Sequence, residues 1–590
     1  MKLRPVTSEP RQRPIAALDV EGDGEHGLVV ASLVTEDDER VYTEADKLIA
    51  DMTTRDMRGV VVYSHRLTYD AGVLVPWLPD ETRLLFAGEK IFKGVLGSDT
   101  RHRFYFGDSS GLWGGLSLSQ IAAEVGMSRL PVPESLIRGR AGGRGYPAPE
   151  LSQGGRIRAF ANQESRIVRE AMDLLQQEIQ ALGGELKFTL ASTALDLFRR
   201  EYLDDEYWTP FYYRNEFARR AYYGGRCEAF SLGWWDCVNV YDFNSHYPAQ
   251  MAGHDFPDPN STIGPRQPGR LAWIMDLEGC SDCTVDVPHC KYPPLPYRVG
   301  IQTFFPVGVF RGVWCHNELR YAMQHGVRIR DVHATMYSED AVRPFGGYVN
   351  DLWARRKELE AQNPARALIY KLLLNSLAGK FGQRVDGGLR QLETMDAYWK
   401  HEPVVGTEVM VLRRTAYAKV PVPVKYLPDH VIVPWAAYIT AYGRIELHKR
   451  MLETSGPVLY VDTDSIMCFS GLPTGDELGD LSLQAEGATV DLIAPKMYDL
   501  VTADGERNPV AKGVPVSVAG EYCTYREVEY WKALNWVEAV RMKLDPSSWL
   551  KVKKHARLDN PKRRYTRIPG FRQDCWISEP LLVNWIAGHY

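Results

Sequence analysis

The sequence has few cysteines and no long apolar run. Nine cysteines among 590 residues are too few for a fold held together by disulfides, and no stretch approaches the roughly 20 apolar residues that cross a bilayer. The opening MKLRPVTSEPRQRP lacks the apolar core of a signal peptide. We therefore expect a protein of the reducing cytoplasm with no membrane contact.

An excess of positive charge is also missing. The formal net charge is −5, so binding to a polyanion would need a local basic surface. Residues 551–567 supply a candidate, with eight Lys or Arg, among them Lys553 and Lys554, against one Asp. Contact with a duplex backbone is the functional interpretation of this segment, and a solvated helix face is the structural alternative.

The rest of the composition is typical of a globular protein, with 45% hydrophobic and 25% charged residues. A chain of this length exceeds a single core, and typical domain sizes predict roughly three to five compact units. The Gly/Pro/Arg-rich segment 138–155 is predicted as an exposed loop. The helix that follows ends at Gly183-Gly184, which predicts a domain boundary near residue 185.

One cysteine cluster has the spacing of a metal site. Cys280 and Cys283 form C-x-x-C, and His289 and Cys290 follow; zinc uses ligands of these types. However, Cys283 leads into TVDV, which is typical of a strand, and no second C-x-x-C follows. We therefore favour free cysteines in a sheet, with zinc as the alternative.

Four acidic residues of the N-terminal part can converge. Asp19 and Glu21 end a predicted strand and, being two apart, point to the same side. Asp70 and Glu164 each lie on a predicted helix that faces this sheet. Four carboxylates from one strand and two helices would hold two metal ions, an arrangement that activates water against a phosphodiester.

A second acidic set lies in the C-terminal part. Asp462 and Asp464 of YVDTDS point the same way in extended geometry, and two such charges repel by roughly 1–4 kcal/mol. A divalent cation between them would remove this repulsion, and oxygen ligands suit Mg²⁺. Asp242, at the end of the strand-like run CVNVYD, is a natural third ligand. Solvated turn aspartates are the structural alternative.

The stretch KLLLNSLAGKFG, residues 371–382, carries one polar pair in an apolar helix. Lys371 and Asn375 are four apart and so share a face. Asn363 is the expected N-cap of this helix and Pro364 its first residue. Taken alone, the pair is typical of the solvated edge of an amphipathic helix.

Together and in this order, these segments resemble the family B DNA polymerases, most of all the protein-primed branch found in linear-genome phages and linear plasmids. The likeness runs over roughly residues 15–515. The segments that carry it are the three N-terminal carboxylate motifs, AYYGGR, YDFNSHYPAQM (motif A), KLLLNSLAGKFG (motif B), YVDTDS (motif C) and PKMY.

The resemblance implies an α/β multidomain fold, in which an RNase H-like 3′–5′ exonuclease domain precedes a right-hand polymerase domain of palm, fingers and thumb. The implied boundaries are 1–185 for the exonuclease domain, 186–590 for the polymerase domain, 186–256 and about 431–520 for the palm, about 257–345 for a palm insertion, about 346–382 for the fingers, about 383–430 for a second insertion and about 521–590 for the thumb.

It also implies template-directed DNA synthesis with strand displacement and proofreading. Two Mg²⁺ ions would lie at Asp242 and Asp464 with Asp462 beside them, and two more at Asp19, Glu21 and Asp70; Mn²⁺ could replace Mg²⁺. The other implied roles are triphosphate binding by Lys371 and by Arg355 or Arg356, nucleotide-pocket contacts by Asn375 and Tyr247, primer binding by Lys496 and Tyr498, and template contact by Tyr222, Gly224 and Gly225.

The implied partners are template-primer DNA, deoxynucleoside triphosphates and a terminal protein that serves as primer. The chain is expected to act as a monomer, in the bacterial cytoplasm that hosts a phage or plasmid. Extension of an ordinary primer, or synthesis without one, is the alternative to protein priming. A non-catalytic DNA-binding protein is a remote alternative, opposed by the intact Asp242, Asp462, Asp464 and Lys371.

Four residues depart from the family pattern. Ala378 stands where motif B usually has tyrosine, which should loosen the nucleotide pocket. Arg66 replaces the asparagine of the second exonuclease motif, and Phe160 and Glu164 replace the tyrosine and aspartate of the third. The extra methylene of glutamate moves its oxygens by about 1.5 Å. We therefore expect a weakened exonuclease, with a purely structural N-terminal domain as the alternative.

Overall fold

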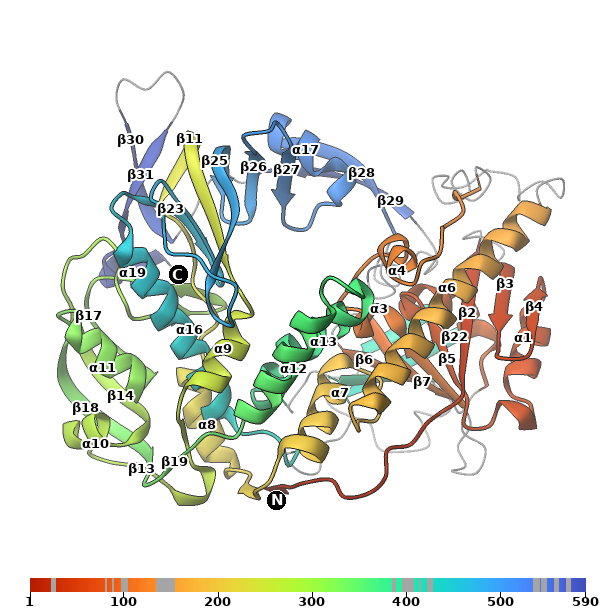
Figure 1. The fold of residues 1–590 in the computed structure, drawn as a ribbon, viewed down its shortest axis with the longest axis horizontal. Helices are drawn as coiled ribbons and strands as arrows, with labels where there is room; N and C mark the ends of the chain where they lie inside the picture. The colour runs from red at the N-terminus through yellow and green to blue at the C-terminus, as the bar shows by residue number, and fades with distance from the viewer. Residues whose placement is uncertain are drawn as a thin grey trace.

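The computed structural model covers the N-terminal part, the polymerase-like part and most of the C-terminal part of the chain. Figure 1 shows the helix pair α12 (Gly346–Leu359) and α13 (Pro364–Ser376) between a mixed sheet on one side and a second sheet on the other, with α17 (Val516–Tyr525) and β28 (Glu527–Ala533) above them. The described residues are 1–22, 28–79, 82–87, 90–96, 104–133, 154–384, 389–394, 408–412, 415–421, 428–533, 538, 542, 549–556, 562–568 and 575–589. The loop expected at 138–155 lies outside them, apart from its last two residues.

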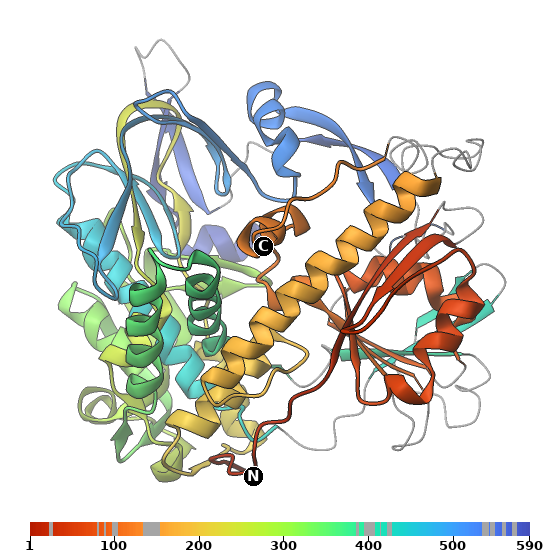
Figure 2. The same ribbon diagram turned by 45° about the vertical axis from the view of Figure 1, so that its right-hand side comes forward.

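The N-terminal sheet is built around β2, whose side chains alternate between two cores. Ile15 and Ala17 pack with the long helix α6, whereas Leu18 and Val20 pack on the opposite face. β2 runs antiparallel to β3 and parallel to β5, and Figure 2 shows α6 beside the sheet. The elements are β2 (Ile15–Gly22), β3 (Leu28–Val34), β4 (Glu39–Tyr42), β5 (Val61–Ser64), α2 (Leu67–Leu74), β6 (Arg83–Ala87), β7 (Lys90–Leu96), β8 (Phe104–Asp108), α4 (Leu118–Glu124) and α6 (Gly154–Ala181).

This sheet continues into a segment far away in sequence. Its ten strands have the order β21-β22-β20-β6-β7-β8-β5-β2-β3-β4, so the described strands of the expected second insertion extend the N-terminal sheet through antiparallel pairing of β20 with β6. An edge strand with unpaired N–H and C=O groups accepts such an addition. The added strands are β20 (Leu389–Thr394), β21 (Glu408–Leu412) and β22 (Thr415–Pro421).

A second, nine-stranded sheet lies where the palm is expected, and we call it the palm sheet. Helix α16 covers one face, with Leu447 and Met451 in the same core as Tyr241 and Val461 of the sheet. The elements are β10 (Cys227–Ala229), β11 (Ser231–Phe243), α9 (His246–Gly253), α16 (Val433–Glu453), β23 (Val458–Asp462), β24 (Ser465–Cys468), β25 (Leu481–Ala494), β26 (Met497–Val501) and β27 (Arg507–Ala511).

The expected palm insertion forms its own four-stranded sheet, in the order β13-β18-β14-β17. Cys280 and Cys283 of β14 fall in different apolar cores, because residues three apart on a strand point to opposite faces. No disulfide joins the cysteines of the described residues. Because the Cys280 and Cys283 side chains point to opposite faces of the sheet, they are not placed to bind one zinc ion together, which favours the interpretation as thiols in a sheet. The elements are β13 (Thr262–Arg266), α10 (Leu271–Asp276), β14 (Glu278–Val287), β17 (Gly308–Cys315), α11 (His316–Gln324) and β18 (Arg328–Ser338).

The fingers region is the helix pair α12 (Gly346–Leu359) and α13 (Pro364–Ser376). The side chain of Asn363 accepts a hydrogen bond from the Arg366 N–H at 3.1 Å, which confirms the predicted N-cap. Helix α13 packs against α7 (Leu190–Leu197), and Leu373 and Leu374 are fully buried there. Ala378 begins the short helix α14 (Ala378–Phe381) and is partly buried against the same core.

The C-terminal region contains the basic segment, for which a solvated helix face was the structural alternative. The basic segment 551–567 contributes strands, not a helix, in its described residues. β30 and β31 also pair with each other and, through β31, with β11, so part of the expected thumb belongs to the palm sheet. The elements are α17 (Val516–Tyr525), β28 (Glu527–Ala533), β29 (Trp549–His555), β30 (Arg563–Arg567), β31 (Trp576–Pro580) and α19 (Val583–His589). Among the helices that the structure describes, none has the length and apolarity of a bilayer span.

Candidate active site

Two carboxylates meet where neighbouring strands of the palm sheet end. Asp242 lies near the end of β11 in register with Ser465 of β24, and Asp464 occupies the turn that joins β23 to β24. The Phe243 N–H donates to the Asp464 carbonyl at 2.8 Å. Thr463 takes a left-handed φ of 63°, which makes this turn tight. The predicted pairing of Asp242 with motif C is therefore present.

The electrostatics of this pair fit a divalent cation. Burial and then the charge of Asp464 raise the pKa of Asp242 to about 6, and burial also raises the pKa of Asp464. Ionising both carboxylates next to each other is therefore energetically unfavourable, and a bound cation would offset this cost. Mg²⁺ is commonly held by one or two carboxylates plus water and substrate phosphates, so these two side chains are a sufficient protein contribution.

Asp462 is turned to a different partner. Lys496 donates to both of its carboxylate oxygens at 2.7 Å, and the Tyr460 hydroxyl donates to Oδ2 at 2.9 Å. Burial lowers the pKa of Lys496, but the hydrogen bond and charge of Asp462 outweigh it and raise that pKa. Tyr498 lies close by on β26, with its ring 5.9 Å from that of Tyr460. The hydrogen bonds of Lys496 to Asp462 therefore connect the PKMY segment to motif C.

The two fingers helices α12 and α13 each place a basic side chain near Asp242 and Asp464. Lys371 and Asn375 are both exposed on one face of α13, as their spacing predicts, and the charge of Lys371 lowers the pKa of Asp242 and of Asp464. On α12 the two candidate arginines differ: Arg355 pairs with Asp351 at 3.0 Å, whereas Arg356 donates to the Ser245 hydroxyl of motif A at 3.2 Å. Of the two, Arg356 is the one directed at the site.

Tyr247 of α9 depends on a glycine behind it. A Cβ on Gly443 of α16 would lie 2.9 Å from the Tyr247 ring and 3.0 Å from His246 Nε2, so only glycine leaves room for both rings. Burial raises the pKa of Tyr247 to about 12, and the charges of Asp464 and Asp462 contribute. The tyrosine therefore lies within electrostatic reach of both carboxylates.

The Tyr-x-Gly-Gly segment is held by a buried ion pair that sequence reasoning missed. Arg444 of α16 donates to the carbonyls of Tyr223 and Gly224 at 2.8 and 2.9 Å and to both oxygens of Glu318 of α11 at 2.8 and 3.0 Å. The side chains of Arg444 and Glu318 are each 1% exposed. The sequence indicated this ion pair only through the position of Arg444 within the mostly apolar run WAAYITAYGRIEL.

The two glycines and the tyrosine of this segment have different surroundings. A Cβ on Gly225 would collide with the Thr463 side chain at 2.6 Å, so this residue packs directly on the motif C turn. A Cβ on Gly224 would meet no atom within 4 Å. The Tyr222 ring lies against Gly382, whose Cβ would come within 2.5 Å of it. The segment thus connects motif C with the end of motif B.

The basic segment is partly neutralised in its described residues. Lys551 pairs with Glu529 at 2.8 Å and Lys553 with Glu527 at 3.5 Å, because β29 lies beside the acidic face of β28. Lys554 donates to the Gly513 carbonyl at 2.9 Å. The local excess of positive charge is therefore smaller than the sequence alone indicates.

The N-terminal carboxylates also gather, but unequally. Asp19 and Glu21 share the face of β2 that carries Ile15 and Ala17, toward α6. Asp70 accepts hydrogen bonds from the Val20 N–H at 2.9 Å and from the Ser64 hydroxyl. Burial raises the pKa of Asp70 to about 8, and the charge of Glu21 contributes, so these two carboxylates are neighbours.

The remaining residues of this site are engaged elsewhere. Both oxygens of Glu164 accept hydrogen bonds from Arg129, so Glu164 does not present a free carboxylate to the other three. Phe160 is 1% exposed. Arg66 is exposed, has a left-handed φ of 68° and donates its backbone N–H to Asp108 at 3.0 Å. The predicted convergence of four carboxylates is therefore not found: among the described residues, no group of three or more His, Cys, Asp or Glu is arranged to hold a metal ion.

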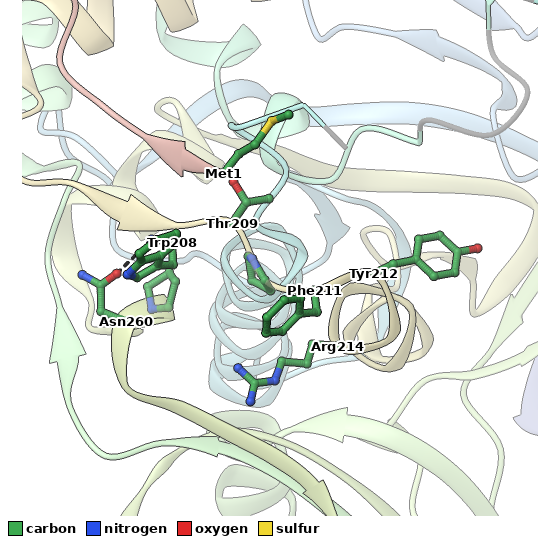
Figure 3. A pocket seen from close by; sticks show the side chains of 9 residues that line it. Met1, Trp208, Thr209, Phe211, Tyr212, Arg214 and Asn260 are labelled. Atoms are coloured by element: carbon green, nitrogen blue, oxygen red, sulfur yellow. Dashed lines mark hydrogen bonds between the residues drawn. The ribbon is translucent and has the colours of Figure 1, made fainter. Parts of the chain in front are cut away.

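A separate surface hollow of about 500 Å³ contains no predicted site residue. Figure 3 shows Trp208, Phe211 and Arg214 around it, with the hydrogen bond between Trp208 and Asn260. The rings of Phe211 and Tyr213 are stacked at a centroid distance of 6.1 Å. It lies at the start of α8 (Tyr212–Ala221), the helix that leads into the Tyr-x-Gly-Gly segment.

Fold and site together define a class: a right-hand polymerase fold with an N-terminal exonuclease-type domain. Residues 165–400 match the family described as DNA polymerase type B, organellar and viral. The predicted resemblance to the family B DNA polymerases is thereby confirmed over residues 165–400, and the curated relatives described next carry polymerase names.

Curated relatives carry names of the same kind. The chain is 26% identical over 341 residues to a "Probable DNA polymerase" of Neurospora intermedia, covering 52% of this chain and 33% of that protein. It is 25% identical over 335 residues to the "DNA-directed DNA polymerase" of Enterobacteria phage PRD1, covering 56% and 57%. The chain therefore spans less than two thirds of the length of either relative.

Solved structures agree on the fold. An orthorhombic crystal form of Phi29 DNA polymerase superposes with a TM-score of 0.70 at 15% identity, covering 93% of this chain and 100% of that one. The same polymerase complexed with primer-template DNA gives a TM-score of 0.67 at 17% identity, covering 92% and 99%. The predicted fold class, an exonuclease-type domain followed by palm, fingers and thumb, is confirmed.

Proposed function

We propose that this chain is a template-directed DNA polymerase that adds deoxynucleotides to a primer 3′-hydroxyl by two-metal phosphoryl transfer. The observation that carries the proposal is the meeting of Asp242 with Asp464 within the electrostatic reach of Lys371. Two neighbouring carboxylates opposite a cation on a separate helix match a reaction whose substrate brings both metal and phosphate to the site.

Asp242 and Asp464 would hold the metal ions. When bound, Mg²⁺ or Mn²⁺ lowers the pKa of the attacking hydroxyl and neutralises charge on the leaving pyrophosphate. Lys371 and Arg356 would bind the triphosphate, because their charged ends face the motif A turn and the carboxylates. Asn375, one turn beyond Lys371, would line the nucleotide pocket.

The remaining groups would orient the two DNA strands and the sugar. Tyr247, packed on Gly443, would exclude a 2′-hydroxyl. Lys496 and Tyr498 would hold the primer end beside Asp462. Gly224, whose Cα faces open space, would let the backbone approach the template strand.

Primer extension with Mg²⁺ and the four deoxynucleotides tests the proposal. Asp242→Asn and Asp464→Asn should each reduce the extension rate by about 10³-fold or more, since each removes a charge that the transition state needs. Asp476→Asn, an exposed aspartate of the same domain, should leave the rate unchanged. Full extension by either site variant would disprove the mechanism.

Protein priming and strand displacement belong to the same proposal. The separate sheet at 262–338 is the candidate guide for a priming protein, and the strands β20 to β22 that bridge to the N-terminal sheet are the candidate DNA enclosure. Incubation of the polymerase, a linear template and one labelled deoxynucleotide with a candidate terminal protein should yield a covalent nucleotide–protein adduct. Labelling only of oligonucleotide primers would favour the alternative of ordinary priming.

We further propose that the N-terminal domain is a 3′–5′ exonuclease whose metal ligands are Asp19, Glu21 and Asp70. The support is the position of Asp70 beside β2, where it accepts a hydrogen bond from the Val20 N–H, between Asp19 and Glu21, and where the Glu21 charge acts on it. Single-stranded DNA should be shortened in the presence of Mg²⁺ or Mn²⁺, and Asp19→Ala should abolish the shortening while primer extension persists. Equal digestion by wild type and Asp19→Ala would leave the domain a structural role.

A further inference from the structure

The edge strand of the palm sheet supports the motif C turn. β10 lies at the end of the strand order beside β23, with Cys227 in register with Asp462. Directly before β10, the Arg226 carbonyl accepts a hydrogen bond from the Thr463 N–H at 2.7 Å. Thr463 is the left-handed residue between Asp462 and Asp464. A displacement of β10 would therefore displace the turn that carries Asp464.

The C-terminal hairpin β30–β31 closes the open edge of β10. The Tyr565 hydroxyl donates to the Ala229 carbonyl at 2.7 Å. The Ser578 N–H and hydroxyl both donate to the Phe230 carbonyl, at 3.0 and 2.8 Å. The outward carbonyls of an edge strand need partners of this kind when they are covered. The hairpin thus holds the backbone at the end of β10 in a defined place.

Two arginines and one glutamate connect the same two parts, and we call them the buried triad. Arg226 Nε donates to Glu228 Oε2 at 2.7 Å, and Arg563 Nη1 lies 3.7 Å from Glu228 Oε1. The three side chains are at most 1% exposed. Arg226 also donates to the Pro293 carbonyl at 3.0 Å, and Arg563 donates to the Ser578 hydroxyl at 2.7 Å. Glu228 therefore lies between an arginine next to the motif C turn and an arginine of the hairpin.

The buried triad combines two positive charges with one negative charge. Burial lowers the pKa of Arg563; the charge of Glu228 opposes this effect and that of Arg226 adds to it. Apolar side chains of similar volume are often at least as stabilising as a buried ionic group, so stability alone is a weak reason for the triad. Charge-assisted hydrogen bonds do fix the distance and direction between the segments that they join. The triad is better explained by the position that it gives to β10.

We propose that the β30–β31 hairpin positions Asp464 from the far side of β10. Arg563 and Tyr565 hold β10, and β10 in turn holds the motif C turn. This inference rests on the proposed polymerase function and adds positioning residues to it. Arg563 belongs to the basic segment 551–567, but its side chain is 0% exposed and is therefore not a DNA contact. Loss of either residue's contact should slow the chemical step and leave the affinity for primer-template unchanged.

Single-turnover extension at saturating Mg²⁺ and nucleotide tests the inference. Arg563→Gln should lower the rate by about 10- to 100-fold, because a misplacement of about 1 Å at the reacting groups has an effect of this size. Tyr565→Phe, which removes only a hydroxyl group, should lower the rate by about fivefold. Glu579→Gln, an exposed change on β31, should keep the wild-type rate. The dissociation constant for primer-template, measured by fluorescence anisotropy, should be the same in wild type and in every variant.

Hydrogen exchange supplies a readout besides turnover. The amides of residues 458–464 should exchange about fivefold faster or more in Arg563→Gln and Tyr565→Phe than in wild type or Glu579→Gln. If Arg563→Gln does not fold, Tyr565→Phe alone decides.

Three results would overturn the inference and leave the polymerase proposal intact. They are wild-type extension rates in the hairpin variants, a loss confined to primer-template affinity, and a lowered thermal midpoint with unchanged rate and exchange. If the wild-type protein itself does not extend the primer, the proposed function fails, and this inference fails with it.

Discussion

At the scale of single residues, two aspartates that are two positions apart have different surroundings. Asp464 faces Asp242, whereas both oxygens of Asp462 face the Lys496 ammonium. The intervening Thr463 has a left-handed φ, which turns the second carboxylate away from the direction that simple strand alternation predicts. The motif therefore contains one candidate metal ligand and one carboxylate that holds a lysine.

This difference predicts unequal effects of the same substitution. Asp464→Asn should abolish extension, whereas Asp462→Asn should lower it by about 10- to 100-fold, because it releases Lys496 but leaves the metal pair in place. Single-turnover extension at saturating nucleotide measures both. Adding Lys496→Met to Asp462→Asn should lower the extension rate only slightly further, since the two residues act as one unit. Strictly additive losses would contradict the coupling.

At the scale of elements, α16 ties the palm to the insertion and to the Tyr-x-Gly-Gly segment through Arg444 and Glu318. Removing one partner of a buried pair typically costs about 3–5 kcal/mol, because the other charge stays buried and unpaired. Glu318→Gln should therefore lower the thermal midpoint and raise the KM for primer-template. Lys449→Gln, whose side chain is 48% exposed in its pair with Glu446 on the same helix, should change neither by a measurable amount.

A double variant separates stability from positioning. Arg444→Met with Glu318→Leu removes both charges, which should restore much of the thermal midpoint. The hydrogen bonds to the Tyr223 and Gly224 carbonyls would still be missing, so the raised KM for primer-template should persist. Recovery of both quantities would show that Arg444 serves stability alone.

A buried imidazole on the same helix predicts a pH dependence of stability. His448 is 3% exposed; its Nδ1 accepts from the Tyr321 hydroxyl and its Nε2 donates to the Tyr292 carbonyl, each at 2.7 Å. Burial lowers its pKa to about 3, with further lowering by the charges of Arg226 and His325. The neutral imidazole is therefore the one that the fold accommodates.

The sign follows from comparing the two states. Below the ordinary pKa of about 6.5 the unfolded imidazole binds a proton that the folded one does not, so acidification costs up to about 1.4 kcal/mol of stability per pH unit. The thermal midpoint of wild type should fall between about pH 7.5 and pH 5, and that of His448→Gln should fall less. His289→Gln, an exposed histidine, should behave as wild type; an equal fall in His448→Gln would contradict the assignment.

At the scale of the whole molecule, the N-terminal domain and the polymerase-like part share a sheet. Gln391 of β20 is in register with Leu85 of β6 and with Val420 of β22, so residues far apart in the chain form one ladder. A second connection joins Arg366 of α13 to Glu178 of α6 at 2.8 Å. The fingers helix α13 is therefore in direct contact with the long helix of the N-terminal domain.

Gln391→Pro should break this ladder, because proline removes an N–H donor and disturbs the pairing. Hydrogen exchange of residues 83–87 should accelerate by about tenfold or more, and strand displacement on a nicked duplex should fall while extension of a primer on single-stranded template persists. Gln391→Ala keeps the donor and should retain both protection and displacement. Unchanged exchange in the proline variant would refute the pairing.

The local and periodic features could be read from the sequence. Asp19 and Glu21 share a face, Lys371 and Asn375 share another, and Asn363 caps its helix, because each of these depends only on residues a few positions apart. The collinear motifs also predicted the fold class. The partial neutralisation of the basic segment at 551–567 could not be predicted from the sequence, since its glutamate partners lie on another strand, β28.

What the chain determined by itself, then, is which acidic and basic side chains exist and at what spacing along helices and strands. Only the tertiary structure decided how they pair: Arg356 rather than Arg355 toward motif A, Lys496 on Asp462, Arg129 on Glu164 and Arg444 on Glu318. The physical reason is that charge pairing falls off within a few ångströms, while most of these partners lie tens to hundreds of residues apart.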